Sequence, residues 1–315
     1  MVPEKKTLTQ KLAGQGSPAI FGSHPRFWEF FTVHIRNPHT RRAYFRSVRF
    51  FSDWCQAYGL SLAEIQPFHI AAYIEMLGQT RSKPTVKQSL AAVRMLFDWL
   101  VVGQVTSTNP ASAVRGPKHS TGKGKAPILT ADEMRQLLGS IETSTIKGLR
   151  DRALIALMAY TFARVGAAVG LTVADFYIEG RRGWVRLHEK GGKVTAMPCH
   201  HNLEAYLDAY LASAGLGVEP HAPLFPTIRG GILTRSPLAQ SNVHKMLRRR
   251  AAAAGIRTLL ACHSLRATGI TTYLGNGGKL EIAQWMAGHS SPRTTSLYDR
   301  RSDAVGLDEV ERIIY

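Results

Sequence analysis

A segment rich in glycine, proline, serine and lysine divides this chain into two parts. It reads TSTNPASAVRGPKHSTGKGKAP, and the residues on both sides of it are far richer in apolar side chains. A stretch of this composition buries too little apolar surface to pack by itself and is typical of a linker between domains. We therefore predict a flexible N-terminus over residues 1–22, a first domain over 23–110, a linker over 111–127 and a second domain over 128–315.

The first domain is predicted to be a bundle of short helices. Helical patterns of apolar residues recur in the segments HPRFWEFFTVHI, PHTRRAYFRSVRFFSDWCQAYG, QPFHIAAYIEMLG and KPTVKQSLAAVRMLFDWLV. In the second segment, apolar side chains recur at steps of three and four positions. This spacing predicts a buried stripe made of Tyr44, Val48, Phe51 and Cys55.

The opposite side of that helix is basic, and we expect it to bind the phosphates of DNA. The candidate contacts are Arg41, Arg42, Arg46 and Arg49, joined from elsewhere in the chain by Lys87, Arg94, Lys123 and Lys125. For any single helix, a charged face that is merely solvated is an equally good interpretation.

The overall charge of the chain also favours DNA as the partner. The chain has 40 Lys+Arg against 22 Asp+Glu, a formal net charge of +18 and a pI of about 10.2. Such an excess is uncommon in proteins that handle small metabolites and favours a polyanionic partner, nucleic acid before an anionic membrane surface. A generically basic surface is the alternative.

Neither a disulfide framework nor a metal site is predicted. Cys55, Cys199 and Cys262 are odd in number, widely spaced and never in a C-x-x-C pair. Cys199-His200-His201 has no second ligand pair at usable spacing, so we place it in a loop at the end of a strand. The most apolar run, ALIALMAYTFA, is too short to span a bilayer, and MVPEKKTLTQK lacks the apolar core of a signal peptide. We expect a soluble, cytoplasmic protein that does not enter a membrane.

The second domain is predicted to combine helices with a small β-sheet, so that the fold class is mainly α, or α+β. Thr130 and Glu133 hold capping-box positions at its first helix, and Arg164 is expected to close a strongly apolar helix. The segment GWVRLHEKGGKVTAMPC alternates as two strands around Gly191-Gly192, which predicts a hairpin.

Helices are expected to resume after the hairpin. One covers NLEAYLDAYLASAG, and another is predicted to start at Ser236-Pro237. A third is opened by Ser291-Pro292 and would carry Tyr298 about two turns along, with His289 just before it. The tail GLDEVERIIY predicts an amphipathic helix over residues 306–315.

Several residues of the second domain are suited to hold a phosphate. His263 and Arg266 are three apart at the head of a predicted helix, so both project from one face near its positive end. Arg164 invites a bidentate anion, and Lys190 in the hairpin turn could reach a DNA groove. Taken singly, each has a plainer interpretation: a core histidine, a partner of a buried aspartate, a solvated turn lysine.

Taken as an ordered set, these residues supply every group needed to break a phosphodiester without a metal. Two guanidiniums neutralise the phosphate as charge builds on its oxygens. The hydroxyl of Tyr298 can attack once a neighbouring histidine accepts its proton or stabilises the resulting anion. A lysine or histidine on the other side protonates the departing 5′-oxygen.

The motifs that carry this set resemble those of the tyrosine recombinase (phage integrase) family, in particular its Xer-like members. HSLR at 263–266 is similar to the family's His-x-x-Arg box, and GHSSPRTTSLY at 288–298 to its Gly-His followed by the nucleophilic tyrosine. FARVGAAVGLTVADF resembles the first-arginine box, and EKGGKVTAMP the strand-turn-strand that carries the family's lysine. The likeness covers about residues 127–300, and the upstream helices fit the family's SAM-like core-binding domain less specifically.

The resemblance implies a role for each matched residue. Tyr298 would form a 3′-phosphotyrosyl link and release a 5′-hydroxyl, while Arg164 and Arg266 would clamp the scissile phosphate. Lys190 would act as the general acid, and His263 and His289 would assist proton transfer. No cofactor is implied, because one ester is exchanged for another of similar energy.

The resemblance also implies an assembly. The two domains would form a C-shaped clamp on double-stranded DNA at a specific recombination site, in a homotetramer that passes through a Holliday junction. The tail would dock on a neighbouring protomer, although packing on its own domain is equally compatible with the sequence. The DNA would be that of a bacterial nucleoid or plasmid.

The chain departs from the family pattern at two positions. The acidic residue that usually follows three positions after the first arginine is Ala167, and the residue after Arg266, often histidine, is Ala267. Two other functions share parts of the pattern: a type IB topoisomerase-like relaxer of DNA, and a catalytically inactive DNA-binding regulator on the same fold.

Overall fold

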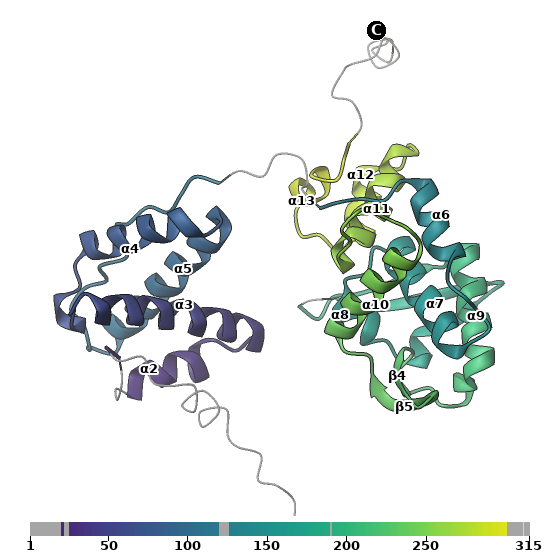
Figure 1. Cartoon of the computed structure of the whole chain (residues 1–315), viewed down its shortest axis with the longest axis horizontal. Coiled ribbons are helices and arrows are strands. Elements are labelled where there is room, and N and C mark those ends of the chain that lie inside the picture. The colour runs from purple at the N-terminus through teal and green to yellow at the C-terminus, as the bar shows by residue number, and fades with distance from the viewer. Residues whose placement is uncertain (1–19, 22–24, 120–125, 190, 301–310, 312–315) are drawn as a thin grey trace, which may run out of the picture. The chain divides into compact units, whose positions relative to one another are not determined.

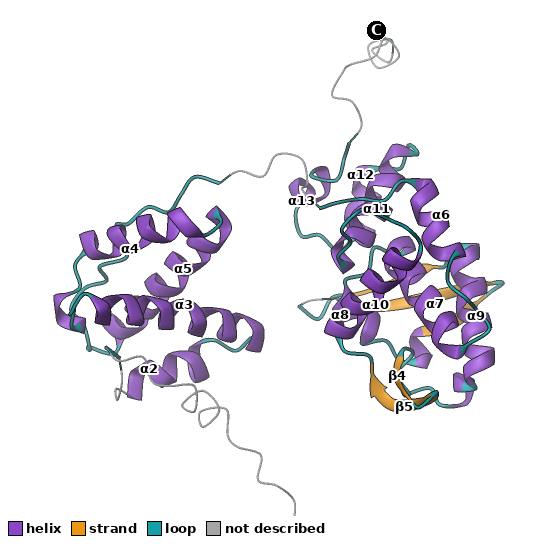
Figure 2. Ribbon diagram, viewed as in Figure 1, coloured by secondary structure: helices purple, strands orange, loops and turns teal. Residues whose placement is uncertain are grey.

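The computed structural model describes residues 20–21, 25–119, 126–189, 191–300 and 311. The chain divides into two compact units, residues 1–120 and 121–315 (Figure 1). Helices predominate in both units, and within the described ranges all strands lie in the second unit (Figure 2). The predicted class, mainly α with small β-sheets, is confirmed. No helix in the described ranges has the length and apolar character needed to cross a lipid bilayer.

The first unit contains the helical segments that the sequence predicts. They are α2 (Pro25–Glu29), which continues as a π-helical turn over Phe30–His34, then α3 (Pro38–Ala57), a 3₁₀ turn over Leu62–Glu64, α4 (Pro67–Thr80) and α5 (Lys83–Val102). Proline occupies the first turn of α3, α4 and α5, where its missing N–H loses no hydrogen bond. The side-chain oxygen of Asn37 accepts from the N–H groups of His39 and Thr40 and so caps α3.

The core of the first unit forms along the predicted stripe of α3. Val48, Phe51 and Cys55 are fully buried, and Tyr44 packs against them from a partly buried position. Phe51 also meets the ring of Tyr73 from α4 edge-on, at 5.0 Å between centroids. The apolar period of the sequence therefore decided which side of α3 faces inward.

The second unit begins with α6 and ends with α13. Its helices are α6 (Ala131–Gly139), α7 (Ile146–Tyr160), α8 (Val165–Val169), α9 (His201–Ala214), α10 (Gln240–Ala253), α11 (Cys262–Gly275), α12 (Leu280–Met286) and α13 (Pro292–Ser296), with 3₁₀ turns at Val173–Asp175 and Leu216–Val218. The capping box at the start of α6 is present: Thr130 accepts from the Glu133 N–H, and Glu133 accepts from the Thr130 N–H.

The predicted hairpin is part of a three-stranded antiparallel sheet. The strands are β1 (Phe176–Glu179), β2 (Arg182–His188) and β3 (Val194–Pro198), in the order β1-β2-β3. Trp184 pairs with Pro198 at one end of β2 and β3, and His188 pairs with Val194 next to the turn. Val185 and Leu187 are buried while their neighbours on β2 are more exposed, so one face of the sheet packs on the core.

The helix start predicted at Ser236-Pro237 is wrong. Ser236-Pro237 does not start a helix, because both residues end β5 (Ile232–Pro237), which pairs with β4 (Pro226–Arg229) in a hairpin that the sequence analysis missed. The helix α10 starts later, after Ala239. A serine followed by proline suits the last positions of an edge strand as well as the first turn of a helix, and pairing with β4 decided between the two.

Arg164 does not close the apolar helix. The helix α7 ends at Tyr160, and Phe162 then takes a left-handed backbone conformation with φ of 56°. The chain turns there, and Arg164 becomes the N-cap residue of the short helix α8. The turn places Arg164 at the start of a new element, with its side chain 38% exposed.

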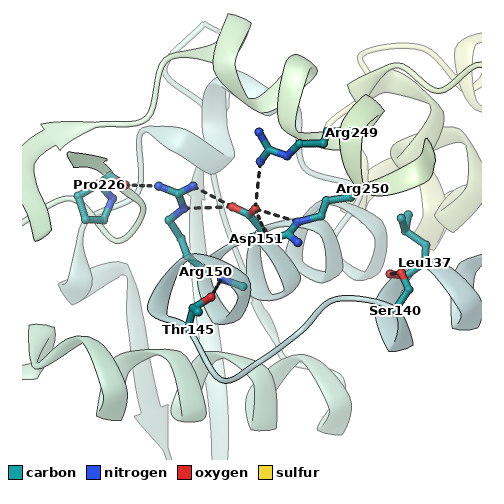
Figure 3. Close-up of polar contacts among 9 residues, drawn as sticks. Leu137, Ser140, Thr145, Arg150, Asp151, Pro226, Arg249 and Arg250 are labelled. Carbon is teal, nitrogen blue, oxygen red and sulfur yellow. Dashed lines mark hydrogen bonds and ion pairs between the residues drawn. The ribbon is translucent and has the colours of Figure 1, made fainter. Parts of the chain in front are cut away.

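A buried ionic network fastens α7 to α10 and β4 (Figure 3). The fully buried carboxylate of Asp151 accepts from Arg150 at 2.8 Å on one oxygen and from Arg250 at 2.8 Å on the other. Arg150 also donates to the carbonyl of Pro226 at 3.0 Å. A buried charge requires such pairing, and removing Asp151 would leave the buried charge of Arg150 uncompensated.

The helices α7 and α11 approach closely where α11 carries Gly269. A Cβ atom added at Gly269 would overlap the carbonyl oxygen of Ala159 and would lie 2.8 Å from the ring of Phe162. Only a residue without a side chain therefore allows α11 to pack against the end of α7. Arg266 lies one turn earlier on the same helix, so this contact also sets the depth at which Arg266 lies.

We expect Gly269→Ala to lower the free energy of unfolding by about 1–3 kcal/mol, because the helices must separate to accept a methyl group. The matched control is Gly275→Ala at the end of the same helix, where an added Cβ meets nothing within 4 Å. That control should leave the stability unchanged or raise it by up to about 1 kcal/mol. Urea unfolding followed by circular dichroism measures both, and equal stabilities would contradict the close approach.

Candidate active site

Tyr298 lies just beyond the short helix α13, not within it. Ser291 is the N-cap of this helix and Pro292 its first residue, as predicted, but the helix ends at Ser296. The predicted placement two turns along a helix is therefore wrong. The Tyr298 N–H donates to the carbonyl of Thr295 at 2.9 Å, and its own carbonyl accepts from the hydroxyl of Thr271 on α11 at 3.0 Å. These two hydrogen bonds fix its backbone.

The ring of Tyr298 is packed into a small hydrophobic cluster. It is 8% exposed and shares that cluster with Phe162, Ala267 and Ala287, among other residues. The ring is therefore part of the core of the second unit. The hydroxyl is different, because it forms a 2.6 Å hydrogen bond with Nε2 of His263.

Two histidines frame the tyrosine. His263 stands in the first turn of α11, where Ser264 Oγ accepts from the Ala261 N–H and marks the start of the helix. His289 follows α12, and its ring stacks on that of Tyr298, with 5.9 Å between centroids and 9° between planes. The Nδ1 atom of His289 is hydrogen-bonded to the Thr295 hydroxyl at 2.9 Å, which fixes the orientation of the imidazole.

A left-handed glycine delivers His289 to this position. Gly288 has φ of 57° and ends α12: its N–H donates to the Trp285 carbonyl at 2.9 Å, and the N–H of His289 donates to the Gln284 carbonyl at 3.1 Å. This pair of hydrogen bonds is the Schellman motif of helix ends. The bend at Gly288 reverses the chain toward the tyrosine.

Arg266 is the most deeply buried cation of the site. It is 1% exposed, and its two terminal nitrogens donate to the backbone carbonyls of Phe162 and Ala287. Its Nε has no hydrogen-bond partner among the described residues. The guanidinium is therefore held from two sides by backbone carbonyls.

Arg164 is paired with a carboxylate that the sequence analysis did not single out. Its Nη1 donates to Oε2 of Glu189, the last residue described before the hairpin turn. The Glu189 side chain is 3% exposed, and its backbone N–H donates to the Lys193 carbonyl at 2.7 Å. Two features of the sequence could have identified Glu189. Position 167, where the family usually has an acidic residue, is alanine, and an acidic residue directly precedes Lys190.

The surroundings shift the pKa of the tyrosine, of both histidines and of Arg266. Burial raises the pKa of Tyr298, and the charges of Arg266 and Arg164 oppose that rise. Desolvation, followed by the same two arginines, lowers the pKa of His263, and it lowers the pKa of His289 to about 4. Burial and the neighbouring Arg164 lower the pKa of Arg266 to about 10, which leaves it charged at neutral pH.

The structure brings together five of the six predicted catalytic residues, Arg164, His263, Arg266, His289 and Tyr298. The sixth, Lys190, lies outside the described residues, as do Lys123 and Lys125. No group of three or more metal-ligating side chains in the described ranges is arranged to hold a metal ion.

The candidate DNA contacts of the first unit fall into two kinds. Arg42, Arg46 and Lys87 are exposed or partly exposed, and Arg49 is exposed beside Asp53 at 3.9 Å. The side chains of Arg41 and Arg94 instead form hydrogen bonds with backbone carbonyls. Arg41 donates twice to the Ile35 carbonyl, and Arg94 donates to the carbonyls of Ala111 and Val114. Those hydrogen bonds give Arg41 and Arg94 a structural role that the sequence analysis did not predict.

Comparison with known proteins identifies relatives over both units. The family described as "Phage integrase family" matches residues 127–304, and "Phage integrase, N-terminal SAM-like domain" matches residues 26–103. Tyrosine recombinase XerD of Shewanella oneidensis is 29% identical over 263 residues, which cover 82% of this chain and 85% of the relative. Tyrosine recombinase XerD of Vibrio cholerae is 32% identical over 231 residues, which cover 72% of this chain and 74% of the relative.

Solved structures share the fold. The XerH site-specific recombinase bound to a palindromic difH substrate, a post-cleavage complex, aligns with a TM-score of 0.69 and 24% identity over 82% of this chain and 75% of that chain. A lambda integrase tetramer bound to a Holliday junction aligns with a TM-score of 0.68 and 20% identity over 89% of this chain and 78% of that chain.

The family matches and the fold define a site-specific DNA recombinase. The family matches cover most of the described chain and agree with the motifs of the sequence. The chain belongs to the phage integrase family of tyrosine recombinases, which carry out site-specific DNA recombination.

The stability of the folded chain should depend on pH through His289. Its folded pKa is about 4, against an ordinary value of 6.5. Between these values the unfolded chain binds a proton that the folded chain does not, so the free energy of unfolding falls as the pH drops from 6.5 toward 4. His289→Gln should reduce this fall. Urea unfolding at two pH values inside and above this range measures it, with His201→Gln, an exposed histidine of α9, as the control.

If His289→Gln and the native chain lost the same stability on acidification, His289 would not be held in its neutral form by the fold.

Proposed function

We propose that Tyr298 is the nucleophile with which this recombinase cleaves DNA. The observation that carries the proposal is the 2.6 Å hydrogen bond between the Tyr298 hydroxyl and Nε2 of His263, next to the charges of Arg266 and Arg164. A phenol attacks only after losing its proton, and a neutral imidazole at this distance can accept it. Desolvation lowers the pKa of His263, so its imidazole is neutral at physiological pH and has a lone pair available for the proton.

The step exchanges one phosphodiester for another. The Tyr298 oxygen forms a bond to phosphorus, the bond from phosphorus to the 5′-oxygen breaks, and the phenolic proton passes to His263. The products are a 3′-phosphotyrosyl link and a free 5′-hydroxyl, whose oxygen takes its proton from Lys190 in the role that the family resemblance implies. Because the two esters have similar energy, the step needs no ATP, and a second 5′-hydroxyl can reverse it on another strand.

Arg266 and Arg164 stabilise the charge that builds on the phosphate oxygens. Support comes from the pKa shifts of both histidines and of the tyrosine. The charges of Arg266 and Arg164 contribute to all three shifts, so both arginines lie close to these side chains. The fork of Arg164 is partly exposed and can donate to an anion, while Arg266 contributes its charge from a buried position. His289 supports the transfer from the face of the tyrosine ring on which it stacks, where it restricts the motion of that ring.

The partner is double-stranded DNA at a specific recombination site, bound by a homotetramer that passes through a Holliday junction. The net charge of +18 and the relatives' complexes with DNA support this proposal. The tail over residues 306–315, of which only residue 311 is described, would join protomers by docking in trans. The bacterial Xer relatives support action in the cytoplasm, on nucleoid or plasmid DNA.

The two alternatives carry less support. A type IB topoisomerase-like relaxer would share the chemistry, but both units of this chain match phage integrase models. An inactive regulator would have no chemical need for a buried tyrosine aligned with a neutral histidine between two arginines.

Tyr298→Phe should abolish covalent attachment of the chain to a nicked suicide substrate, because the attacking oxygen is gone, and should leave DNA affinity within a factor of about two. The substrate is a DNA fragment taken from the region that flanks the gene, where the recombination site is expected. Denaturing gels measure the adduct and filter binding measures the affinity. The matched control is Tyr273→Phe on α11, which should keep the adduct. An adduct that persists in Tyr298→Phe would assign the nucleophile to another residue.

The basic side of α3 should contribute to DNA affinity in a salt-dependent way. Replacing Arg42 and Arg46 together with alanine should reduce the slope of log affinity against log salt by about one for each phosphate that the arginines neutralise. Arg94→Ala provides the contrast: it should lower the stability of the chain, because Arg94 fastens two carbonyls, and leave the slope unchanged. A slope that stays constant in the double variant would place the DNA on another face.

A further inference from the structure

Arg164 depends on a partner to hold its guanidinium toward a phosphate. Its side chain is 38% exposed and starts from the N-cap position of a helix of only five residues, so its own element restrains it weakly. The third residue after it is Ala167, whose methyl group accepts no hydrogen bond. Within the described residues, the carboxylate that pairs with Arg164 is Glu189, 25 positions further along the chain.

Glu189 is fixed more firmly than Arg164. It directly follows β2 of the three-stranded sheet, its N–H is bound by the Lys193 carbonyl, and its side chain is 3% exposed. It also lies against the bend that delivers His289, because a Cβ atom built on Gly288 would be 3.5 Å from Glu189 Cγ. The carboxylate thus occupies the point where the hairpin, the start of α8 and the end of α12 meet.

A buried carboxylate at this point balances two cations. Arg164 lowers the pKa of Arg266, since like charges repel, and Glu189 raises it. Without a counter-ion, the exposed arginine of such a pair would turn toward solvent and away from the buried one. Glu189 has a second oxygen, Oε1, that is buried without a partner in the described chain and can accept another N–H of the same fork.

We propose that Glu189 is the positioning residue for Arg164, and that it supplies from the β2–β3 hairpin the carboxylate that Ala167 lacks. Glu189 touches no substrate atom in this scheme and acts through the guanidinium. Lys190, the candidate general acid, follows Glu189 directly in the sequence. The contact between Glu189 and Arg164 therefore anchors the arginine and also the chain immediately before Lys190. The inference rests on the proposed function of Arg164 in clamping the scissile phosphate.

Glu189→Gln tests the proposal, since glutamine keeps the size of the side chain and one acceptor oxygen but carries no charge. The assay is single-turnover adduct formation on a nicked suicide substrate over a range of protein concentrations. We expect the maximal rate to fall by about tenfold to a hundredfold, as for a misplaced catalytic group. The concentration for half-maximal rate should stay constant or fall, because a negative charge near the phosphate is removed. Glu179→Gln, an exposed carboxylate of the same sheet, should behave as the native chain.

Two combined variants distinguish positioning from a merely structural effect. In an Arg164→Ala background, Glu189→Gln should cause no further loss, because a residue that acts through Arg164 has nothing left to position. Ala167→Glu added to Glu189→Gln should restore at least part of the rate by returning a carboxylate to the fork from α8. Thermal unfolding of each variant shows that it is folded.

A Glu189→Gln chain that cleaves as fast as the native chain, or faster, would overturn the proposal and make Glu189 an opponent of phosphate binding. A further loss in the Arg164→Ala background would also overturn it. Failure of the proposed function of Arg164 has a different signature, an Arg164→Ala chain that forms the adduct as fast as the native chain, so the two results are separable.

Discussion

The burial of Arg266 is the constraint on which the rest of the site depends. A guanidinium that is 1% exposed needs acceptors to offset the loss of water, and those that its two terminal nitrogens reach are the carbonyls of Phe162 and Ala287. One carbonyl comes from the turn between α7 and α8, and the other from the end of α12. The charge therefore holds together the segments that carry Arg164 and His289, and the glycine contact of α11 with α7 sets its depth.

The position of Tyr298 follows from the same core. Its ring belongs to the cluster around Phe162 and Ala267, and its backbone is tied to Thr271 and Thr295, so the hydroxyl meets His263 without help from a long helix. Burial that raises the pKa of the tyrosine also lowers the pKa of the histidine next to it. The resting pair is a protonated phenol beside a neutral imidazole. The same desolvation makes the phenol a weaker acid and the imidazole a weaker base, and the charges of Arg266 and Arg164 oppose that effect at the phenol.

The pairing of Arg164 with Glu189 illustrates how a function can keep its chemistry while one residue changes place. A guanidinium needs a carboxylate within reach, but it is indifferent to the element that provides it. In this chain the β2–β3 hairpin reaches the start of α8, so a glutamate in the hairpin can do what an acid on α8 itself would do. The buried network around Asp151 holds the far end of α7 by the same principle, with arginines drawn from α7 and α10.

The sequence by itself determined the elements whose signals are local. Apolar period fixed the buried side of α3, the capping box fixed the start of α6, and motif spacing singled out His263, Arg266, His289 and Tyr298. Only the tertiary structure decided whether Ser236-Pro237 opens a helix or ends a strand, where α13 stops before Tyr298, and which residue pairs with Arg164. The reason is physical: strand pairing, desolvation and ion pairing join residues far apart in the chain, and no local pattern records them.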